Sequence, residues 1–299
     1  MCGIVGLFLK NKNLEDDLGA MLAPMLDSMC GRGPDSAGLA IYDGIAPLGM
    51  VKISLQHDDH EYDWEKLAKK LEARLGGKVQ FSINSSHALF LVTGEELAIR
   101  KILAEIAGNV SVMSMGKRIQ ILKETGTPGE VIARFGISGM RGSHAIGHTR
   151  MATESAVTTA GSHPFSTGSD LCLVHNGSLS NHSRLRKNLE REGIVFATEN
   201  DTEVAAGYLA HRLQQGLSLQ KALEASLHDL DGFYTFTVGT AEGFAVLRDP
   251  IACKPAVLAE TADYVAMASE YRALASLPGI ENARLWEPEP AVVYNWSHS

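Results

Sequence analysis

Cysteine is scarce in this sequence of 299 residues, and its four copies are far apart. They occupy positions 2, 30, 172 and 253, and no two of them form a C-x-x-C pair. A disulfide framework or a zinc site built on paired cysteines is therefore not expected. Cys30, Cys172 and Cys253 stand in apolar or turn-forming surroundings, which predicts that they are small core residues. Cys2 differs from them because of its position directly after Met1.

Long hydrophobic runs and long basic runs are also missing. No apolar stretch approaches the ~20 residues that cross a membrane, and the first residues lack a basic leader with a cleavage site. Lys and Arg do not cluster, and the formal net charge is −8, which argues against binding to a phosphate backbone. The composition, 45% apolar and 21% charged, is that of an ordinary globular protein. We therefore expect a cytoplasmic protein that binds neither nucleic acid nor membrane.

The first half of the sequence predicts two kinds of region. The first has an apolar strand at 3–9, a helix at 15–29 and a strand at 36–42. The second begins near Ser54 and alternates between helical and strand patterns. Its expected helices are 62–75, 95–107 and 129–135, and its expected strands are 79–83, 87–92, 109–115 and 118–123. That order indicates a small α+β unit, 54–141, inserted into a domain that spans 1–299.

The second half begins with Gly-rich strands and polar loops and then becomes helical. Helices are expected at 180–192, where Ser180 or Asn181 is a plausible cap, and at 202–227. The expected strands that follow are 233–239, 243–248, 256–259, 264–268 and 291–296. Many strands with helices grouped between them indicate an α+β fold in which helices cover the sheets.

Cys2 is a candidate nucleophile because of the chemistry of a chain terminus. Removal of Met1 would leave a thiol and a free α-amine on the same residue. An α-amine titrates near ~8, so an unprotonated fraction is present at neutral pH and acts as a base. A nucleophile and its base on one residue are the N-terminal-nucleophile arrangement. If Met1 were retained, the amine would lie one residue away from the thiol and this base would be lost.

Five short motifs accompany this terminus. They are C-G-I-V-G at 2–6, R-G-P-D-S-A-G at 32–38, G-H-T-R-M-A-T at 147–153, H-N-G at 175–177 and N-D-T-E at 200–203. In this order, the set resembles the class II glutamine amidotransferases, N-terminal-nucleophile hydrolases that release ammonia from glutamine and pass it to a synthase. The resemblance implies a four-layer αββα sandwich, and the strand-rich sequence after the last motif fits such a domain.

The resemblance also implies roles for individual residues. Arg150 matches the arginine that binds the α-carboxylate of L-glutamine, a task suited to a planar bidentate donor. Thr153 is expected to add a contact there, and Asp201 to hold the α-ammonium group. Asn176 and Gly177 match an oxyanion hole, in which loss of one donor typically costs ~10²–10³ in rate. Hydrolysis would then run through a γ-glutamyl thioester on the N-terminal thiol.

Each of these residues also has a structural explanation. Arg150 fits an ordinary salt bridge, and Asp201 fits a helix N-cap. Asn176-Gly177 is a common turn dipeptide. Arg32 and Asp35 are expected to shape the loop beside the N-terminus rather than to touch substrate. The order of the five motifs favours the functional assignment for all but this last pair.

Histidine is the remaining candidate for metal binding. His144 and His148 are four residues apart, but their segment reads as a strand, where that spacing is a weak ligand signal. The acidic run 57–61 contains two histidines and is better explained as a solvated loop. The implied glutaminase chemistry needs no metal and no cofactor.

The sequence offers no recognisable synthase domain. Stand-alone chains of this kind resemble the separate amidotransferase subunit of glutamate-synthase-like complexes, including N-methylglutamate synthase. That resemblance implies a hetero-oligomer with separate synthase subunits, one of them flavin-dependent and another rich in glycine repeats, that receive the ammonia. The unit 54–141 either docks such a partner or is an inert insertion.

Two other functions compete with glutamine hydrolysis. One is hydrolysis of a different amide, against which the pair Arg150 and Asp201 argues, because together they recognise both ends of a free α-amino acid. The other is a non-catalytic scaffold or regulatory subunit derived from a glutaminase domain. The presence of every expected catalytic residue type favours an active enzyme.

Overall fold

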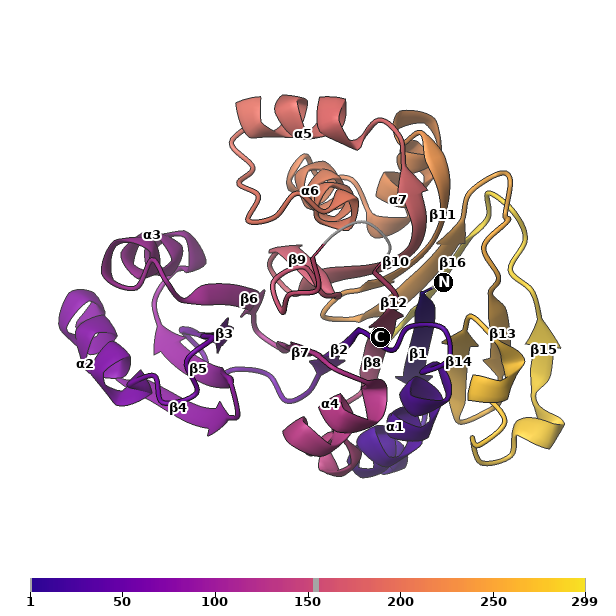
Figure 1. Ribbon diagram of the computed structural model, residues 1–299, viewed down its shortest axis with the longest axis horizontal. Coiled ribbons are helices and arrows are strands. Elements are labelled where there is room, and N and C mark those ends of the chain that lie inside the picture. Colours follow the sequence, from indigo (N-terminus) through magenta and orange to yellow (C-terminus); the bar gives the residue numbers. More distant parts are fainter. Residues whose placement is uncertain (1, 153–155, 299) are drawn as a thin grey trace.

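A computed structural model describes residues 2–152 and 156–298, which form a core and a smaller lobe beside it (Figure 1). The core contains a seven-stranded and a five-stranded sheet, and the lobe contains a four-stranded sheet. Neighbouring strands in each sheet run antiparallel to one another.

The seven-stranded sheet has the order β15-β13-β14-β1-β8-β2-β7. Its strands are β1 (Gly3–Leu9), β2 (Ser36–Tyr42), β7 (Ile119–Thr125), β8 (His144–Arg150), β13 (Val257–Glu260), β14 (Tyr264–Ala268) and β15 (Arg284–Trp286). β1, β2 and β8 are buried along their whole length. Strands covered on both faces tend to read as continuous apolar runs. β1 and β2 do so, whereas β8 carries buried polar residues such as His148 and Arg150.

The five-stranded sheet has the order β16-β12-β11-β10-β9 and packs on the first sheet. Its strands are β9 (Phe165–Gly168), β10 (Leu171–Leu179), β11 (Gly232–Gly239), β12 (Gly243–Arg248) and β16 (Val293–Ser297). Between the sheets, Ile4 and Phe8 of β1 join Val174 of β10 and Phe244 of β12 in one buried cluster. The two inner faces therefore form the core of a sandwich.

Helices cover the outer face of each core sheet. α1 (Leu18–Ser28) and α4 (Pro128–Phe135) share a buried cluster with the seven-stranded sheet. α6 (Asp201–Gln214) and α7 (Leu219–Asp229) share one with the five-stranded sheet, and α5 (His182–Arg191) packs beside them. Short 3₁₀ helices occur at Lys12–Asp17, Ile137–Gly139, Tyr271–Ala273 and Ile280–Asn282. The layers run helix, sheet, sheet, helix, which confirms the predicted αββα class.

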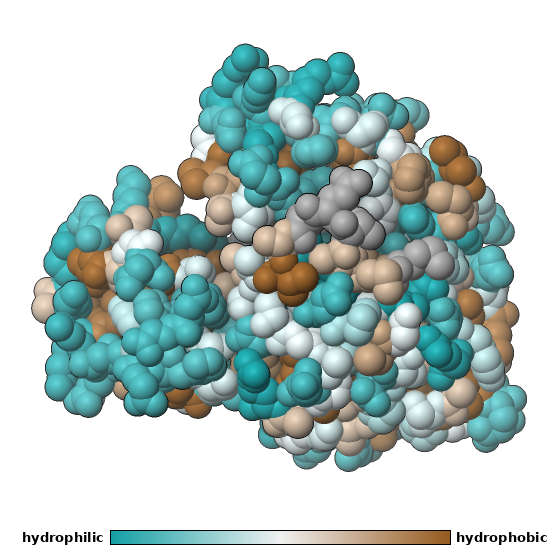
Figure 2. Space-filling model, in the orientation of Figure 1, coloured by the Kyte–Doolittle hydropathy of each residue, from teal (hydrophilic) through white to brown (hydrophobic). Residues whose placement is uncertain are grey.

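The lobe is a two-layer unit with a hydrophobic core of its own. Its sheet has the order β4-β5-β3-β6. The strands are β3 (Met50–Gln56), β4 (Val79–Asn84), β5 (His87–Thr93) and β6 (Ser111–Gly116), and the helices are α2 (Trp64–Leu75) and α3 (Glu96–Ile106). Phe90, Leu71 and Ile99 are fully buried between them. Most of the lobe surface in Figure 2 is hydrophilic, as expected where amphipathic helices turn their polar sides to water.

The lobe does not coincide with the expected unit 54–141. β3, which begins at Met50, belongs to the lobe sheet. β7 lies inside 54–141 but pairs with β2 along seven residues of the core sheet, and α4 packs on the core as well. The alternation of helix and strand in the sequence is the same on both sides of this boundary, so it does not reveal which sheet a strand joins.

Two other expectations differ from the structure. The helix expected at 202–227 is two helices, because the chain turns at Gly216 with φ +87 and restarts with Ser218 as the N-cap of α7. Among the cysteines, Cys172 is buried as expected, whereas Cys30 is only partly buried and Cys253 is exposed. No helix in the described part of the chain is both long and apolar enough to cross a membrane.

Candidate active site

Cys2 lies directly before β1, at the centre of the seven-stranded sheet. Its carbonyl oxygen accepts a hydrogen bond of 2.8 Å from Arg32 Nε and one of 3.2 Å from Asn176 Nδ2. Arg32 follows α1, and Asn176 belongs to β10 of the opposite sheet. Side chains from both halves of the sandwich thus hold the first described residue, while Cys2 itself stays partly accessible.

The Arg32 guanidinium is anchored on its far side by Glu270. Arg32 Nη1 lies 2.7 Å from Glu270 Oε1, and Arg32 is only 7% exposed. The hydrogen bond from Arg32, together with Arg272, lowers the pKa of Glu270 and keeps it charged. The described contacts of Arg32 are with the Cys2 backbone and with Glu270. Glu270 was not predicted, because an acidic residue after a strand has no local signal that links it to a residue 238 positions away.

The loop after α1 approaches β8 so closely that it requires glycine. A Cβ on Gly33 would lie 2.4 Å from the carbonyl carbon of Thr149. Next to it, the Asp35 N–H donates to Arg150 O at 3.1 Å, and Asp35 Oδ2 accepts from Ala152 N at 2.8 Å. Asp35 thus contacts the backbone on both sides of Met151.

Arg150 is the last residue of β8 and is buried. β8 pairs with β1 in a register that sets Gly3 opposite Thr149. One further step in this antiparallel register sets Cys2 opposite Arg150 at the end of the sheet. Arg150 Nη1 donates to Ala156 O at 3.4 Å. Thr153, the other residue expected in this part of the site, lies outside the described residues.

Asn176 and Gly177 occupy the interior of β10 rather than a turn. Gly177 has φ +148, and a Cβ there would lie 2.0 Å from Phe233 O of the neighbouring strand. This position therefore accepts only glycine without a shift of β11. The turn interpretation of this dipeptide is wrong, since Asn176 pairs with Thr235 and Gly177 with Tyr234 in the sheet.

Asp201 begins α6, and Asn200 is the N-cap of that helix. The Asn200 side chain accepts from Thr202 N at 2.9 Å, so the helix is capped without Asp201. Asp201 Oδ2 instead accepts from Leu179 N at 2.9 Å, and its Oδ1 lies 3.7 Å from His175 Nδ1. Its carboxylate is thereby held against β10, the strand that also carries Asn176.

Three histidines form a buried cluster behind this strand. The rings of His148 and His163 stack at 3.9 Å, and His148 Nε2 lies 3.0 Å from His175 O. The Thr202 hydroxyl lies 2.7 Å from His163 Nε2 and 3.0 Å from His175 Nδ1. Burial lowers the pKa of His148 to about 3 and lowers the pKa values of His163 and His175 as well, so all three are neutral. His163 and Thr202 were not predicted to meet, because no local sequence pattern links residues 39 positions apart.

Hydrogen bonds to the protein backbone occupy the histidine pair that was considered for metal binding. His144 Nε2 contacts Thr240 O at 2.8 Å, whereas His148 faces the cluster just described. Across residues 2–152 and 156–298, no group of three or more His, Cys, Asp or Glu side chains is arranged to hold a metal ion.

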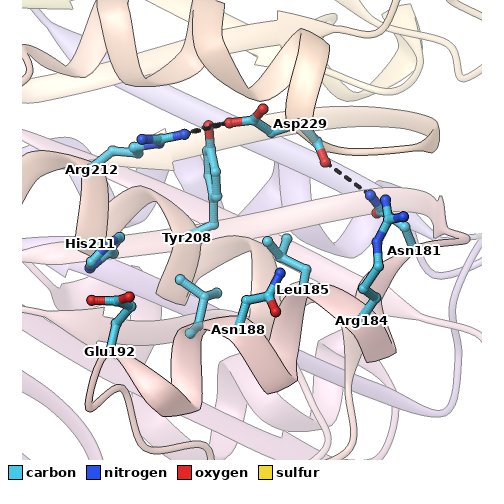
Figure 3. Close-up of a pocket in the computed structure, with 10 residues that line it drawn as sticks. Asn181, Arg184, Leu185, Asn188, Glu192, Tyr208, His211, Arg212 and Asp229 are labelled. Atoms are coloured by element: carbon cyan, nitrogen blue, oxygen red, sulfur yellow. Dashed lines mark hydrogen bonds and ion pairs between the residues drawn. The ribbon is translucent and has the colours of Figure 1, made fainter.

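A surface pocket lies elsewhere, between α5, α6 and α7 (Figure 3). Asp229 accepts hydrogen bonds of 2.6 Å from both Tyr208 and Arg212, and its backbone oxygen accepts from Asn181. Burial and the Asp229 contact raise the pKa of Tyr208 to about 12. These polar groups are engaged with one another and tie the helices together. None of the predicted site residues lines this pocket.

The layered sandwich, with a cysteine at the head of its central strand held by Arg32 and Asn176, has the architecture of an N-terminal-nucleophile hydrolase fold. Comparison with solved structures agrees. The chain superimposes on the glutamine phosphoribosylpyrophosphate amidotransferase from B. subtilis with a TM-score of 0.61 at 22% identity, over 97% of this chain and 46% of that one.

Sequence comparisons give the family. A glutamine amidotransferase domain family matches residues 148–276. The chain is 58% identical to the glutamine amidotransferase-like protein GlxB of Rhizobium meliloti (strain 1021), over 100% of this chain and 99% of that protein. It is 33% identical to the glutamine–fructose-6-phosphate aminotransferase of Idiomarina loihiensis, over 43% of this chain and 21% of that one. The chain therefore belongs to the class II glutamine amidotransferases.

Proposed function

We propose that this chain hydrolyses L-glutamine to glutamate and ammonia through a γ-glutamyl thioester on Cys2. After removal of Met1, the α-amine of Cys2 accepts the thiol proton and the sulfur attacks the side-chain amide carbon of glutamine. The tetrahedral intermediate collapses with proton donation to the departing nitrogen, and ammonia leaves. Water then attacks the thioester carbon, which releases glutamate and restores the thiol.

One observation carries this proposal: the 3.2 Å hydrogen bond from Asn176 Nδ2 to the carbonyl oxygen of Cys2. It brings the side-chain amide of an oxyanion-hole candidate to the residue that bears the nucleophile. Donors arranged before the reaction stabilise the developing oxyanion without reorganisation, and this stabilisation accounts for much of the rate enhancement in acyl transfer. Gly177 is the second donor of the proposed hole, since it follows Asn176 on the same strand.

Glutamine recognition is assigned to Arg150 and Asp201. The guanidinium would bind the α-carboxylate through two parallel hydrogen bonds, and the carboxylate would bind the α-ammonium group. The β1–β8 register, which sets Arg150 opposite Cys2, supports the first role. The contacts of Asp201 with Leu179 and His175 of β10, the strand that carries Asn176, support the second. Thr153 is proposed to assist Arg150.

Covalent labelling tests the nucleophile. The purified chain is treated with a diazoketone analogue of glutamine, and the adduct is located by mass spectrometry. We expect one adduct on an N-terminal Cys2, prevented by glutamine and absent in Cys2→Ala. Exposed Cys253 is an internal control for reactivity that is not directed by the site. An intact Met1 without labelling, or an adduct on Cys253 alone that glutamine does not prevent, would contradict the proposal and favour a non-catalytic subunit.

We further propose that the ammonia passes to a separate synthase chain in a glutamate-synthase-like hetero-oligomer. Glutamine hydrolysis by itself only releases ammonia. A synthase that consumes this ammonia would couple the hydrolysis to a biosynthetic reaction. Affinity purification of the chain from its native host is the test, with identification of the chains that elute with it. Co-elution of a flavin-binding synthase is expected, and elution of the chain alone from a cytosolic extract would contradict this part.

A further inference from the structure

Residues 159–164, which follow Arg150 in the chain, are held against β7 by two buried side chains, Lys123 and Glu124. Lys123 Nζ donates to the carbonyl oxygens of Ser162 at 2.8 Å, Ala160 at 3.1 Å and Pro164 at 3.3 Å. Lys123 is only 4% exposed. One lysine amino group thus gathers three backbone oxygens of a single segment. Burial lowers the pKa of Lys123 to about 7, so these hydrogen bonds do not depend on a permanent charge.

Glu124, the next residue of β7, contacts the same segment and a second region. Its Oε1 accepts from the Thr159 hydroxyl and, at 3.0 Å, from Thr125 N. Its Oε2 accepts from the Ser86 hydroxyl at 2.8 Å. The Ser86 hydroxyl also lies 3.1 Å from His87 Nδ1. Glu124 is 6% exposed, so these hydrogen bonds take the place of hydrogen bonds to water.

Ser86 belongs to the lobe and not to the core. It lies in the turn between β4 and β5 and is 2% exposed. Figure 1 shows β7 between the lobe and the rest of the core sheet. The carboxylate of Glu124 therefore bridges two hydroxyl groups that come from different units, Ser86 of the lobe and Thr159 of the segment after Arg150.

That segment reaches the proposed glutamine site. Arg150 Nη1 donates to Ala156 O at 3.4 Å, and a Cβ on Gly161 would lie 3.6 Å from the same nitrogen. Within the segment, Gly161 N donates to the Thr158 hydroxyl at 3.1 Å, and Ser162 N donates to Thr159 O at 3.2 Å. The turn held by Glu124 and Lys123 is therefore the turn that flanks the Arg150 guanidinium.

We propose that Lys123 and Glu124 are positioning residues for Arg150, and that the Ser86–Glu124–Thr159 chain couples the lobe to glutamine binding. A displacement of the β4–β5 turn moves Ser86 and alters the hydrogen bond from Thr159 to Glu124. The position of the backbone that contacts the Arg150 guanidinium changes as a result. The lobe thereby sets the affinity for glutamine without touching it. This inference rests on the proposed role of Arg150 in binding the α-carboxylate.

Glutamine binding to the full-length chain carrying Cys2→Ser, measured by calorimetry, tests the coupling without catalysis. Thr159→Val removes the hydroxyl and keeps the shape, and we expect it to weaken binding about fivefold. Ser86→Ala is expected to weaken binding about twofold. Because both hydroxyls hold one carboxylate, the double variant should lose less than the product of the single effects. Thr159→Ser should restore binding.

Ser114→Ala is the matched control, since Ser114 is a buried lobe serine whose hydroxyl has no hydrogen-bond partner within the described residues. It should leave binding unchanged. In chains that keep Cys2, Thr159→Val should raise KM for glutamine with little change in kcat, a split that general destabilisation does not produce. Equal binding in Thr159→Val and the parent, or in Ser86→Ala and Ser114→Ala, would overturn the coupling.

The Arg150→Lys variant distinguishes a failure of this inference from a failure of the proposed function on which it rests. In the same background it should abolish detectable glutamine binding, because lysine lacks the bidentate fork. If Arg150→Lys binds normally, or if the Cys2→Ser chain does not bind glutamine at all, the proposed recognition of glutamine is wrong and the coupling is overturned with it.

Discussion

The lobe sheet and the two core sheets are all antiparallel, and both regions bury polar residues, but those of the core include the residues of the proposed site. In the lobe, β4 alternates between more and less exposed residues, and β3 buries Lys52, Ser54 and Gln56 beside apolar side chains such as Phe90. In the core, β8 and most of β10 are buried on both faces and carry polar residues there, among them His148, Arg150 and Asn176. Burying such groups costs stability unless they are hydrogen-bonded.

This comparison indicates where the proposed functional residues of the chain lie. A sheet with one face toward water follows its hydrophobic pattern, and its stability comes from packing. In the core sheets, polar residues at the head of β1 and along β7 take hydrogen-bond partners from distant segments. These two places are the proposed active site and its connection to the lobe.

The largest expected effect contrasts an asparagine of each region. Asn176→Ala should lower kcat for glutamine hydrolysis by about 10²–10³, because an oxyanion donor is lost. Asn84→Ala in the lobe removes only a 3.0 Å hydrogen bond to Phe135 O and should leave kcat unchanged. Steady-state kinetics on both variants test this. Equal effects of the two substitutions would show that burial in the core sheet does not mark catalytic residues.

A smaller effect is expected at the junction of the two regions. Asp170 accepts hydrogen bonds from the backbone N–H groups of Lys117, Arg118 and Ile119 at 2.7, 2.8 and 2.9 Å. Asp170→Ala should destabilise the chain by about 3 kcal/mol, because buried donors are left without an acceptor. Denaturant unfolding measures the loss. Stability within error of the parent would mean that water replaces the carboxylate, and the junction would then be less rigid than the core.

Acid should weaken both regions through their buried histidines. Burial lowers the pKa of His87 in the lobe and of His144 and His148 in the core to about 3. The unfolded chain binds protons near ~6.5 and the folded chain does not. Stability from these groups is therefore complete above that pH and declines as pH falls toward 3. The slope approaches roughly 1 kcal/mol per pH unit for each histidine.

Unfolding curves between pH 5 and 7 measure this slope, since Glu124 and Glu270, whose pKa values are lowered, titrate only in more acidic solution. His87→Gln and His148→Gln should each reduce the slope. A stability that does not depend on pH over this interval would show that the histidines are hydrated in solution.

The smallest effect compares helix caps. Asp63 caps α2 of the lobe by accepting from Lys66 N at 2.8 Å, and Ser218 caps α7 of the core by accepting from Lys221 N at 3.3 Å. Replacement of either residue by alanine should cost about 1 kcal/mol in unfolding free energy and leave glutaminase activity intact. Loss of activity in the Asp63→Ala variant beyond its loss of stability would indicate a stronger link between α2 and the site than the Ser86 contact provides.

The sequence by itself determined most of the helices and strands and the αββα class. Local propensity, apolar periodicity and turn residues act over a few positions, and they were sufficient for β1, β2, β12 and β14, whose bounds agree with expectation within a residue. The five motifs also identified the family, because their residue types and order are specific. The assignment of individual catalytic roles stays a prediction that the proposed experiments test.

Tertiary structure alone decided which elements meet. It placed β7 in the core sheet, joined Arg32 to Glu270 and gathered His163 with Thr202 behind β10. It also set Glu124 between Ser86 and Thr159, and left Cys253 in solvent. Each of these depends on pairing and burial between segments far apart in the chain. Such contacts follow from the closure of the whole fold, and no window of neighbouring residues contains the information that fixes them.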